Sequence, residues 1–169
     1  IQRRLVGSEM CIRDRGLIWV CIKVMENNYD VIILGAGASG MTAALAVYEN
    51  GLSVGLFEKQ NLVGGTAGVS GGIIWAPMNS HMKDKGIKDE RSMAIDYFMS
   101  LSNGEIDPIR LESFIDNCSS AIDFIEEKTD ANFYVLDGYP DSYLDRPGAI
   151  LGGGRALDNK LFNYCKLGK

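Results

Sequence analysis

Three glycines and one glutamate near the start of the chain have the types and spacing of a phosphate-binding loop. The segment GAGASG follows the apolar run 31–34 and places Gly35, Gly37 and Gly40 at its first, third and sixth positions. Gly35 permits a tight turn, Gly37 lets the backbone approach a pyrophosphate, and Gly40 lets a helix pack closely. Further along, Glu58 stands where a carboxylate accepts both hydroxyls of an adenosine ribose. The spacing predicts dinucleotide binding.

A β-α-β unit is needed to hold these residues in place. Residues 31–34 form an apolar run that is typical of a buried parallel strand. An amphipathic helix follows the glycines, and residues 53–57 form a second strand that ends at Glu58. The free N–H groups and partial positive charge at the start of the helix attract phosphate. The pattern therefore predicts an α/β fold.

A second glycine-rich segment, GGTAGVSGG at residues 64–72, selects between dinucleotides. An NAD-binding unit would normally continue into another crossover helix at this point. The N–H groups of this segment and the hydroxyls of Thr66 and Ser70 suit a phosphate, a ribitol or the edge of a flavin. A flexible surface loop is the alternative, but the apolar residues 73–75 that follow would be costly to leave in water. The segment favours FAD.

Together these motifs resemble the FAD-binding half of flavoprotein dehydrogenases related to 3-ketosteroid dehydrogenases, in the fumarate reductase and succinate dehydrogenase superfamily. The resemblance covers about residues 28–169. It rests on acid-Lys, GGT and SGG-x-x-W-x-P-x-N in residues 58–79, and on YPDSYLDRPGAILGGGRALDN in residues 139–159. It implies FAD and an incomplete doubly wound, Rossmann-like FAD-binding domain with inserted helices. The FAD contacts that it implies are Gly35, Ala36, Gly37, Ser39, Gly40, Glu58, Lys59, Gly64, Gly65, Thr66, Ala67, Ser70, Gly71 and Gly72.

The same resemblance implies a catalytic candidate. In steroid Δ1-dehydrogenases, the residue after Pro-Asp is a tyrosine that is implicated in substrate handling. In this chain Ser142 follows Pro140-Asp141, and Tyr143 comes one place later. Tyr143 is therefore the candidate, on condition that the local backbone shifts. The alternative interpretation is a half-buried packing tyrosine.

Family chemistry implies hydrogen removal from, or addition to, a carbon–carbon bond beside a carbonyl. A protein base takes a proton and FAD takes a hydride. Trp75 and Pro77 favour a steroid-like or other bulky ketone as the small-molecule substrate. The first alternative is fumarate reductase-type chemistry on a dicarboxylate, with Arg146 and Arg155 as candidate clamps. The second is an inactive nucleotide-binding fragment, because family members are several hundred residues long and the base is expected beyond Lys169.

The first 24 residues lack apolar periodicity and are expected to be a non-native or disordered leader to residues 25–169. The string GSEMCIRDR at residues 7–15 resembles the translation of sequencing-adapter DNA. A signal peptide is the alternative, but the apolar stretch 16–24 contains Lys23 and lacks a small-residue cleavage site. No stretch of the sequence is long enough to span a membrane.

Charge and cysteine usage restrict the partners and the compartment. A net charge of −5 argues against nucleic-acid partners. The four cysteines show no metal-ligand spacing, and reduced thiols in the cytoplasm are the default without a signal peptide. The single histidine, His81, is expected in a surface loop.

Two scaffold helices and a strand are predicted after the glycine segments. The first helix follows a turn with Asp89 as a possible N-cap, and ends before Asn103-Gly104. Asp107-Pro108 begins the second, whose apolar residues recur at spacings of three and four. Residues 133–136 are predicted to form a short strand, and residues 73–75 are a weaker candidate.

Overall fold

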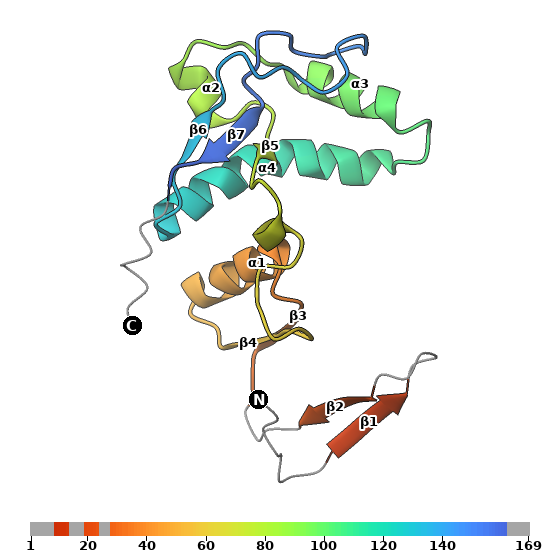
Figure 1. Ribbon diagram of the computed structural model, residues 1–169, viewed down its shortest axis with the longest axis vertical. Coiled ribbons are helices and arrows are strands. Elements are labelled where there is room, and N and C mark those ends of the chain that lie inside the picture. Colours follow the sequence, from red (N-terminus) through yellow and green to blue (C-terminus); the bar gives the residue numbers. More distant parts are fainter. Residues whose placement is uncertain (1–8, 14–18, 24–27, 162–169) are drawn as a thin grey trace. The chain divides into compact units, whose positions relative to one another are not determined.

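The computed structural model describes residues 9–13, 19–23 and 28–161 (Figure 1). The chain divides into two compact units, residues 1–65 and residues 66–169. Each unit combines helices with small sheets, so the predicted α/β class is confirmed.

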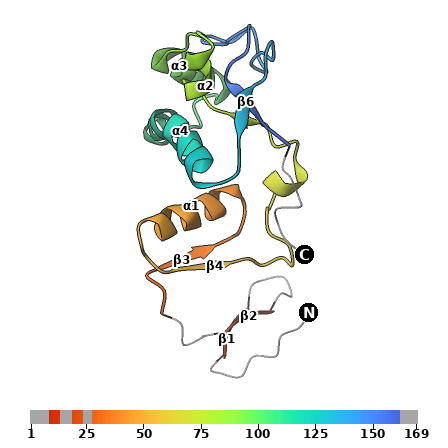
Figure 2. The same ribbon diagram turned by 90° about the vertical axis from the view of Figure 1, so that its left-hand side faces the viewer.

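The first unit contains the predicted β-α-β arrangement. Strand β3 (Val31–Leu34) is followed by helix α1 (Ala38–Glu49) and strand β4 (Val54–Phe57). The two strands pair in parallel, with the first residues opposite each other and the last residues opposite each other. Helix α1 packs on one face of this pair (Figure 2). Because parallel strands end at the same edge, the residues that follow β3 and β4 lie side by side.

The opposite face of the β3–β4 sheet is apolar and open. Ile32 is 61% exposed and Leu34 is 83% exposed, and Phe57, the partner of Leu34 on the neighbouring strand, is also exposed. Parallel sheets normally have both faces covered. An apolar patch of this kind marks a surface that associates with other apolar groups.

An antiparallel hairpin lies within the leader. Strand β1 (Glu9–Arg13) pairs with β2 (Trp19–Lys23) in a two-stranded sheet of its own. The lack of apolar periodicity did not predict these strands, and the assignment of residues 1–24 as a non-native or disordered leader stays a prediction. A hairpin takes its hydrogen bonds from its own two strands, which needs no amphipathic pattern. The remaining residues of the leader lie outside the described part of the chain.

The second unit is built on a three-stranded antiparallel sheet. Its order is β5 (Ile74–Trp75), β7 (Ala156–Asn159) and β6 (Phe133–Val135). Strand β7 was not predicted from the sequence, and it occupies the centre of the sheet. Leu157 pairs with Ile74 on one side and with Val135 on the other, and it is fully buried.

Helices complete the second unit. A 3₁₀ turn, η1 (Ala67–Val69), precedes the α-helices α2 (Ser80–Asp84), α3 (Arg91–Leu101) and α4 (Pro108–Lys128). Helices α3 and α4 (Figure 1) contact each other, and a cluster of buried apolar residues lies between them. Among the described residues, no helix combines the length and apolar character needed to cross a membrane.

The starts of α4 and α3 test two predictions. Helix α4 begins at Pro108, as the Asp107-Pro108 pair predicted, and the Asp107 side chain accepts a hydrogen bond from the backbone N–H of Ile109. The N-cap of α3 is Glu90, not Asp89. The Asp89 carboxylate instead binds the buried guanidinium of Arg155, because an internal cation needs a counter-ion more than an exposed helix end needs a cap.

His81 does not lie in a surface loop, which corrects the sequence-based expectation. It belongs to helix α2, and its Nε2 atom lies 2.8 Å from the Glu126 carboxylate on α4. The other oxygen of Glu126 accepts the N–H of Phe133. Glu126 therefore joins α2 to the start of β6.

Candidate cofactor-binding site

The glycine-rich loop joins β3 to α1 and leaves the helix start open. Gly35 has a φ of +105°, and its N–H donates to the Phe57 carbonyl at 2.7 Å. Gly37 is the N-cap of α1. No side chain caps this end, and no acidic residue lies in the first turn. The unpaired N–H groups of that turn are therefore available to an anion.

Two glycines of the loop serve different purposes. A Cβ atom built on Gly40 would lie 1.8 Å from the Gly35 carbonyl oxygen, so the fold itself excludes a side chain there. A Cβ built on Gly37 would meet nothing within 4 Å, and the φ of −79° suits any residue. Gly37 therefore leaves open space beside the helix start, which is where a pyrophosphate would approach. This geometry fits the phosphates of FAD.

Glu58 is held against the loop by two backbone donors. Its Oε2 atom accepts the Ala36 N–H at 2.8 Å, and its Oε1 atom accepts the Gln60 N–H at 2.9 Å. These hydrogen bonds lower the pKa of the Glu58 carboxyl below its ordinary value, and the bond from Gln60 contributes most. Each carboxylate oxygen keeps a second lone pair, so a ribose hydroxyl pair can also be accepted.

The structure also places part of the second glycine segment against the loop. The Gly64 N–H donates to the Ala36 carbonyl at 2.8 Å, and Gly64 forms a parallel bridge with Gly37. A Cβ built on Gly65 would lie 3.2 Å from the Gly37 Cα atom. Sequence spacing alone could not show this contact. The candidate residues that the first unit gathers around one loop are Gly35, Ala36, Gly37, Gly40, Glu58, Gly64 and Gly65.

The other predicted FAD contacts are exposed residues. Ser39 and Lys59 are exposed residues of the first unit. Thr66, Ala67 and the segment 70–72 belong to the second unit, where they are also exposed. The Ser70 hydroxyl donates to the Ala67 carbonyl and accepts the Gly72 N–H. Their contact with FAD stays a prediction.

Tyr143 is an exposed residue of the segment between β6 and β7. Tyr143 is 54% exposed, so the packing interpretation stays a prediction as well. The Tyr143 backbone N–H donates to the hydroxyl of the buried Tyr97 at 3.2 Å. A catalytic role for Tyr143 stays a prediction, and its exposed position is compatible with contact to a substrate.

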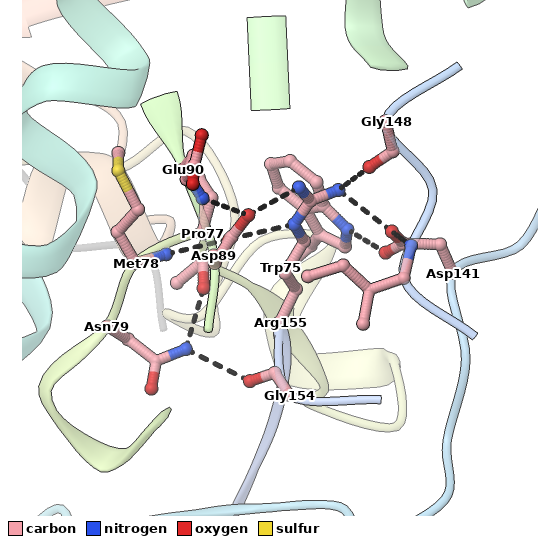
Figure 3. A network of polar contacts seen from close by, with 12 residues as sticks. Trp75, Pro77, Met78, Asn79, Asp89, Glu90, Asp141, Gly148, Gly154 and Arg155 are labelled. Atoms are coloured by element: carbon pink, nitrogen blue, oxygen red, sulfur yellow. Dashed lines mark hydrogen bonds and ion pairs between the residues drawn. The ribbon is translucent and has the colours of Figure 1, made fainter. Parts of the chain in front are cut away.

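Arg155 is not a free clamp for a substrate carboxylate, which corrects one sequence-based candidate. Its side chain and that of Asp89 are each only 1% exposed. Its Nε and Nη2 atoms donate to the two Asp89 oxygens at 2.9 and 2.6 Å, while Nη1 donates to Asp141 at 2.8 Å and to the Gly148 carbonyl at 2.9 Å (Figure 3). Four of the five N–H groups of the guanidinium thus donate to acceptors of the protein itself. Arg146, the other candidate, is exposed.

The two aspartates beside Arg155 are equally well satisfied. Asp89 also accepts the backbone N–H groups of Met78 and Glu90. Asp141 also accepts the indole N–H of Trp75 at 2.7 Å (Figure 3). Sequence reasoning missed this network, although the single arginine between glycines and a buried strand was a usable signal.

Comparison with known proteins places the chain in a family. Residues 30–155 match the FAD binding domain family, and the chain belongs to it. FAD is the cofactor of this domain, as predicted.

Two curated relatives and one solved structure show what the chain resembles. It is 36% identical to the 4-oxocyclohexanecarboxylate 2-dehydrogenase of Sinomonas cyclohexanicum, over 84% of this chain and 25% of that protein. It is 34% identical to the 3-oxosteroid 1-dehydrogenase of Mycobacterium tuberculosis (strain ATCC 25618 / H37Rv), over 83% of this chain and 25% of that protein. The 3-ketosteroid delta1-dehydrogenase of Sterolibacterium denitrificans, solved with 1,4-androstadiene-3,17-dione, superposes with a TM-score of 0.76 at 36% identity, covering 83% and 24% of the two chains. The chain thus spans about a quarter of these relatives' length.

Glu58→Gln is expected to weaken FAD binding by on the order of tenfold or more, because a hydrogen bond to a charged acceptor is lost. The amide keeps the shape of the carboxylate, but its NH₂ group would face the N–H of either Ala36 or Gln60. Flavin titration of the whole protein measures the change, with the exposed Glu49→Gln as control.

FAD affinity is expected to fall at low pH. Because the pKa of Glu58 is lowered, its carboxylate stays charged below the ordinary pKa of a glutamate. The contribution of Glu58 to FAD binding is therefore lost only as pH falls through the lowered pKa. Equal FAD affinity of Glu58→Gln and the parent at neutral pH would contradict the proposed ribose contact.

Proposed function

We propose that the whole protein is an FAD-dependent oxidoreductase that acts on a carbon–carbon bond beside the carbonyl of a ring ketone. The observation that carries the proposal is the 34–36% identity to dehydrogenases named for oxosteroid and oxocyclohexane substrates. The open helix start and the fixed Glu58 support it, because they match the phosphates and the adenosine ribose of FAD. We further propose a doubly wound FAD-binding domain and a cytoplasmic location.

Some residues of this chain bind the cofactor, and Tyr143 contacts the substrate. The α1 N-terminus and Gly37 hold the pyrophosphate, and Glu58 holds the ribose. When bound, FAD supplies a hydride acceptor. The exposed segment 66–72 offers N–H groups and hydroxyls to the remaining part of the cofactor. Tyr143 contacts the ketone through its phenol group.

Oxidation of the substrate requires one hydride and one proton to leave neighbouring carbons, so that the bond between them becomes double. Bound FAD would supply the acceptor for the hydride, and a protein base would take the proton. An external two-electron acceptor would complete the electron balance. Tyr143 either receives the proton or binds the group that does.

A substrate comparison tests the proposal. The whole protein is supplied with a 3-oxosteroid or with 4-oxocyclohexanecarboxylate and an artificial two-electron acceptor, and formation of the conjugated enone is followed by its ultraviolet absorbance. We expect oxidation of at least one ring ketone. Reduction of fumarate by a reduced dye, without oxidation of either ketone, would contradict the proposal.

The fumarate alternative is weakened by the position of Arg155. A dicarboxylate needs guanidinium groups that face it, and the Arg155 guanidinium is buried and already paired with the carboxylates of Asp89 and Asp141. The alternative of an inactive fragment applies to the 169-residue chain taken alone, and the same assay on that chain tests it.

A further inference from the structure

The loop 142–149, which carries Tyr143, is closed at its base. The Asp141 N–H donates to the Ile150 carbonyl at 3.1 Å, and the Ile150 N–H donates to the Asp141 carboxylate at 2.8 Å. Arg155 binds the same carboxylate from the interior (Figure 3). The ends of the loop are thus fixed to each other and to a buried cation.

The second half of the loop is fixed against helix α3. The Gly148 carbonyl accepts a hydrogen bond from Arg155 at 2.9 Å. Gly148 has a φ of +74°, and a Cβ atom built on it would lie 2.0 Å from the Met93 carbonyl oxygen. The loop backbone therefore touches the α3 backbone directly, and only glycine allows this approach.

The first half of the loop is fixed by Tyr97. The Tyr97 ring is 3% exposed, stacks on Trp75 with centroids 6.0 Å apart, and lies 5.8 Å from the Arg155 guanidinium carbon. Its hydroxyl accepts the Tyr143 N–H. A buried, rigidly packed ring thus holds the backbone at Tyr143, while the side chains of Tyr143 and Leu144 remain exposed.

We infer that Tyr97 is a positioning residue that fixes the backbone of Tyr143, so that an exposed phenol is presented from a rigid loop. The inference deepens the proposed function and rests on the contact between Tyr143 and the ketone assigned there. A loop that is already ordered has less conformational freedom to lose when the substrate binds. The Tyr97 hydroxyl holds the backbone amide of Tyr143, and the Tyr143 side chain remains exposed.

Tyr97→Phe tests the inference, because it removes the hydroxyl and keeps the ring that packs on Trp75 and Arg155. Amide hydrogen exchange at Tyr143 is measured in the whole protein by mass spectrometry of short peptides. We expect exchange there to become about tenfold faster, the effect of losing one hydrogen bond. The control is Tyr134→Phe, which removes an exposed hydroxyl bound to Asp158 and should leave Tyr143 unchanged.

Amide exchange at Tyr143 tests the inference about Tyr97, and turnover of the Tyr143→Phe variant tests the role of Tyr143 in the proposed function. Unchanged exchange at Tyr143 in Tyr97→Phe, with the same flavin content as the parent, would overturn the inference. If exchange rises and Tyr143→Phe abolishes turnover, Tyr97→Phe should lower kcat severalfold without a change in flavin affinity. If exchange rises and Tyr143→Phe turns over like the parent, the assigned role of Tyr143 fails, while the backbone contact of Tyr97 stands.

Discussion

Replacing Arg155 with methionine is expected to destabilise the unit of residues 66–169 by about 3–5 kcal/mol. The variant leaves the carboxylates of Asp89 and Asp141 buried without their cation, and removal of one partner from a buried ion pair has a cost of this size. Urea denaturation measures the change. In the 169-residue chain, a Trp19→Phe background makes Trp75, which is bonded to Asp141, the fluorescent reporter.

Arg91→Met is the matched control for this prediction. Arg91 also binds two carboxylates, those of Glu112 and Asp116, but all three side chains are exposed. Exposed ion pairs contribute little to stability. The account would be contradicted if Arg155→Met shifted the urea midpoint no more than Arg91→Met does.

Gly40→Ala is expected to destabilise the first unit by about 3 kcal/mol or more, at the upper end of the cost of overpacking. The added methyl would lie 1.8 Å from the Gly35 carbonyl oxygen, and a backbone atom cannot rotate away as a side chain can. Either α1 moves away from the loop or the loop changes shape. Faster hydrogen exchange in peptides from β3 and β4 would report the loss of stability in the first unit.

Gly37→Ala is the control for Gly40→Ala, because it makes the same change three residues earlier in the loop. Its methyl meets nothing within 4 Å, and the backbone there is extended. Without the cofactor, exchange in β3 and β4 should therefore match the parent. Equal protection in both alanine variants would show that the loop does not have the described conformation.

The first unit was predictable from sequence because its determinants are local. The apolar run 31–34, the glycines and Glu58 each act on neighbours in the chain, and the right-handed parallel β-α-β connection is the usual solution for such a pattern. What remained hidden was the contact of Gly64 with the loop, which depends on how the chain returns after β4.

The second unit was less predictable because long-range pairing decides it. The apolar spacing of α4 predicted its buried face. Strand β7 comes shortly after three glycines, and it forms because it pairs with β5 on one side and β6 on the other. Asp89 looked like a helix cap, and Arg155 looked like a substrate clamp. Only their proximity in space shows that they neutralise each other.

The central claim is that the loop between β3 and α1 holds the pyrophosphate of FAD, and titration of Gly37→Ala with FAD tests it most directly. The methyl enters space that the protein leaves open, so it should weaken FAD binding by at least about tenfold, or 1.4 kcal/mol. Stability without the cofactor should stay at the parental value. Parental FAD affinity in a normally folded Gly37→Ala variant would contradict the account.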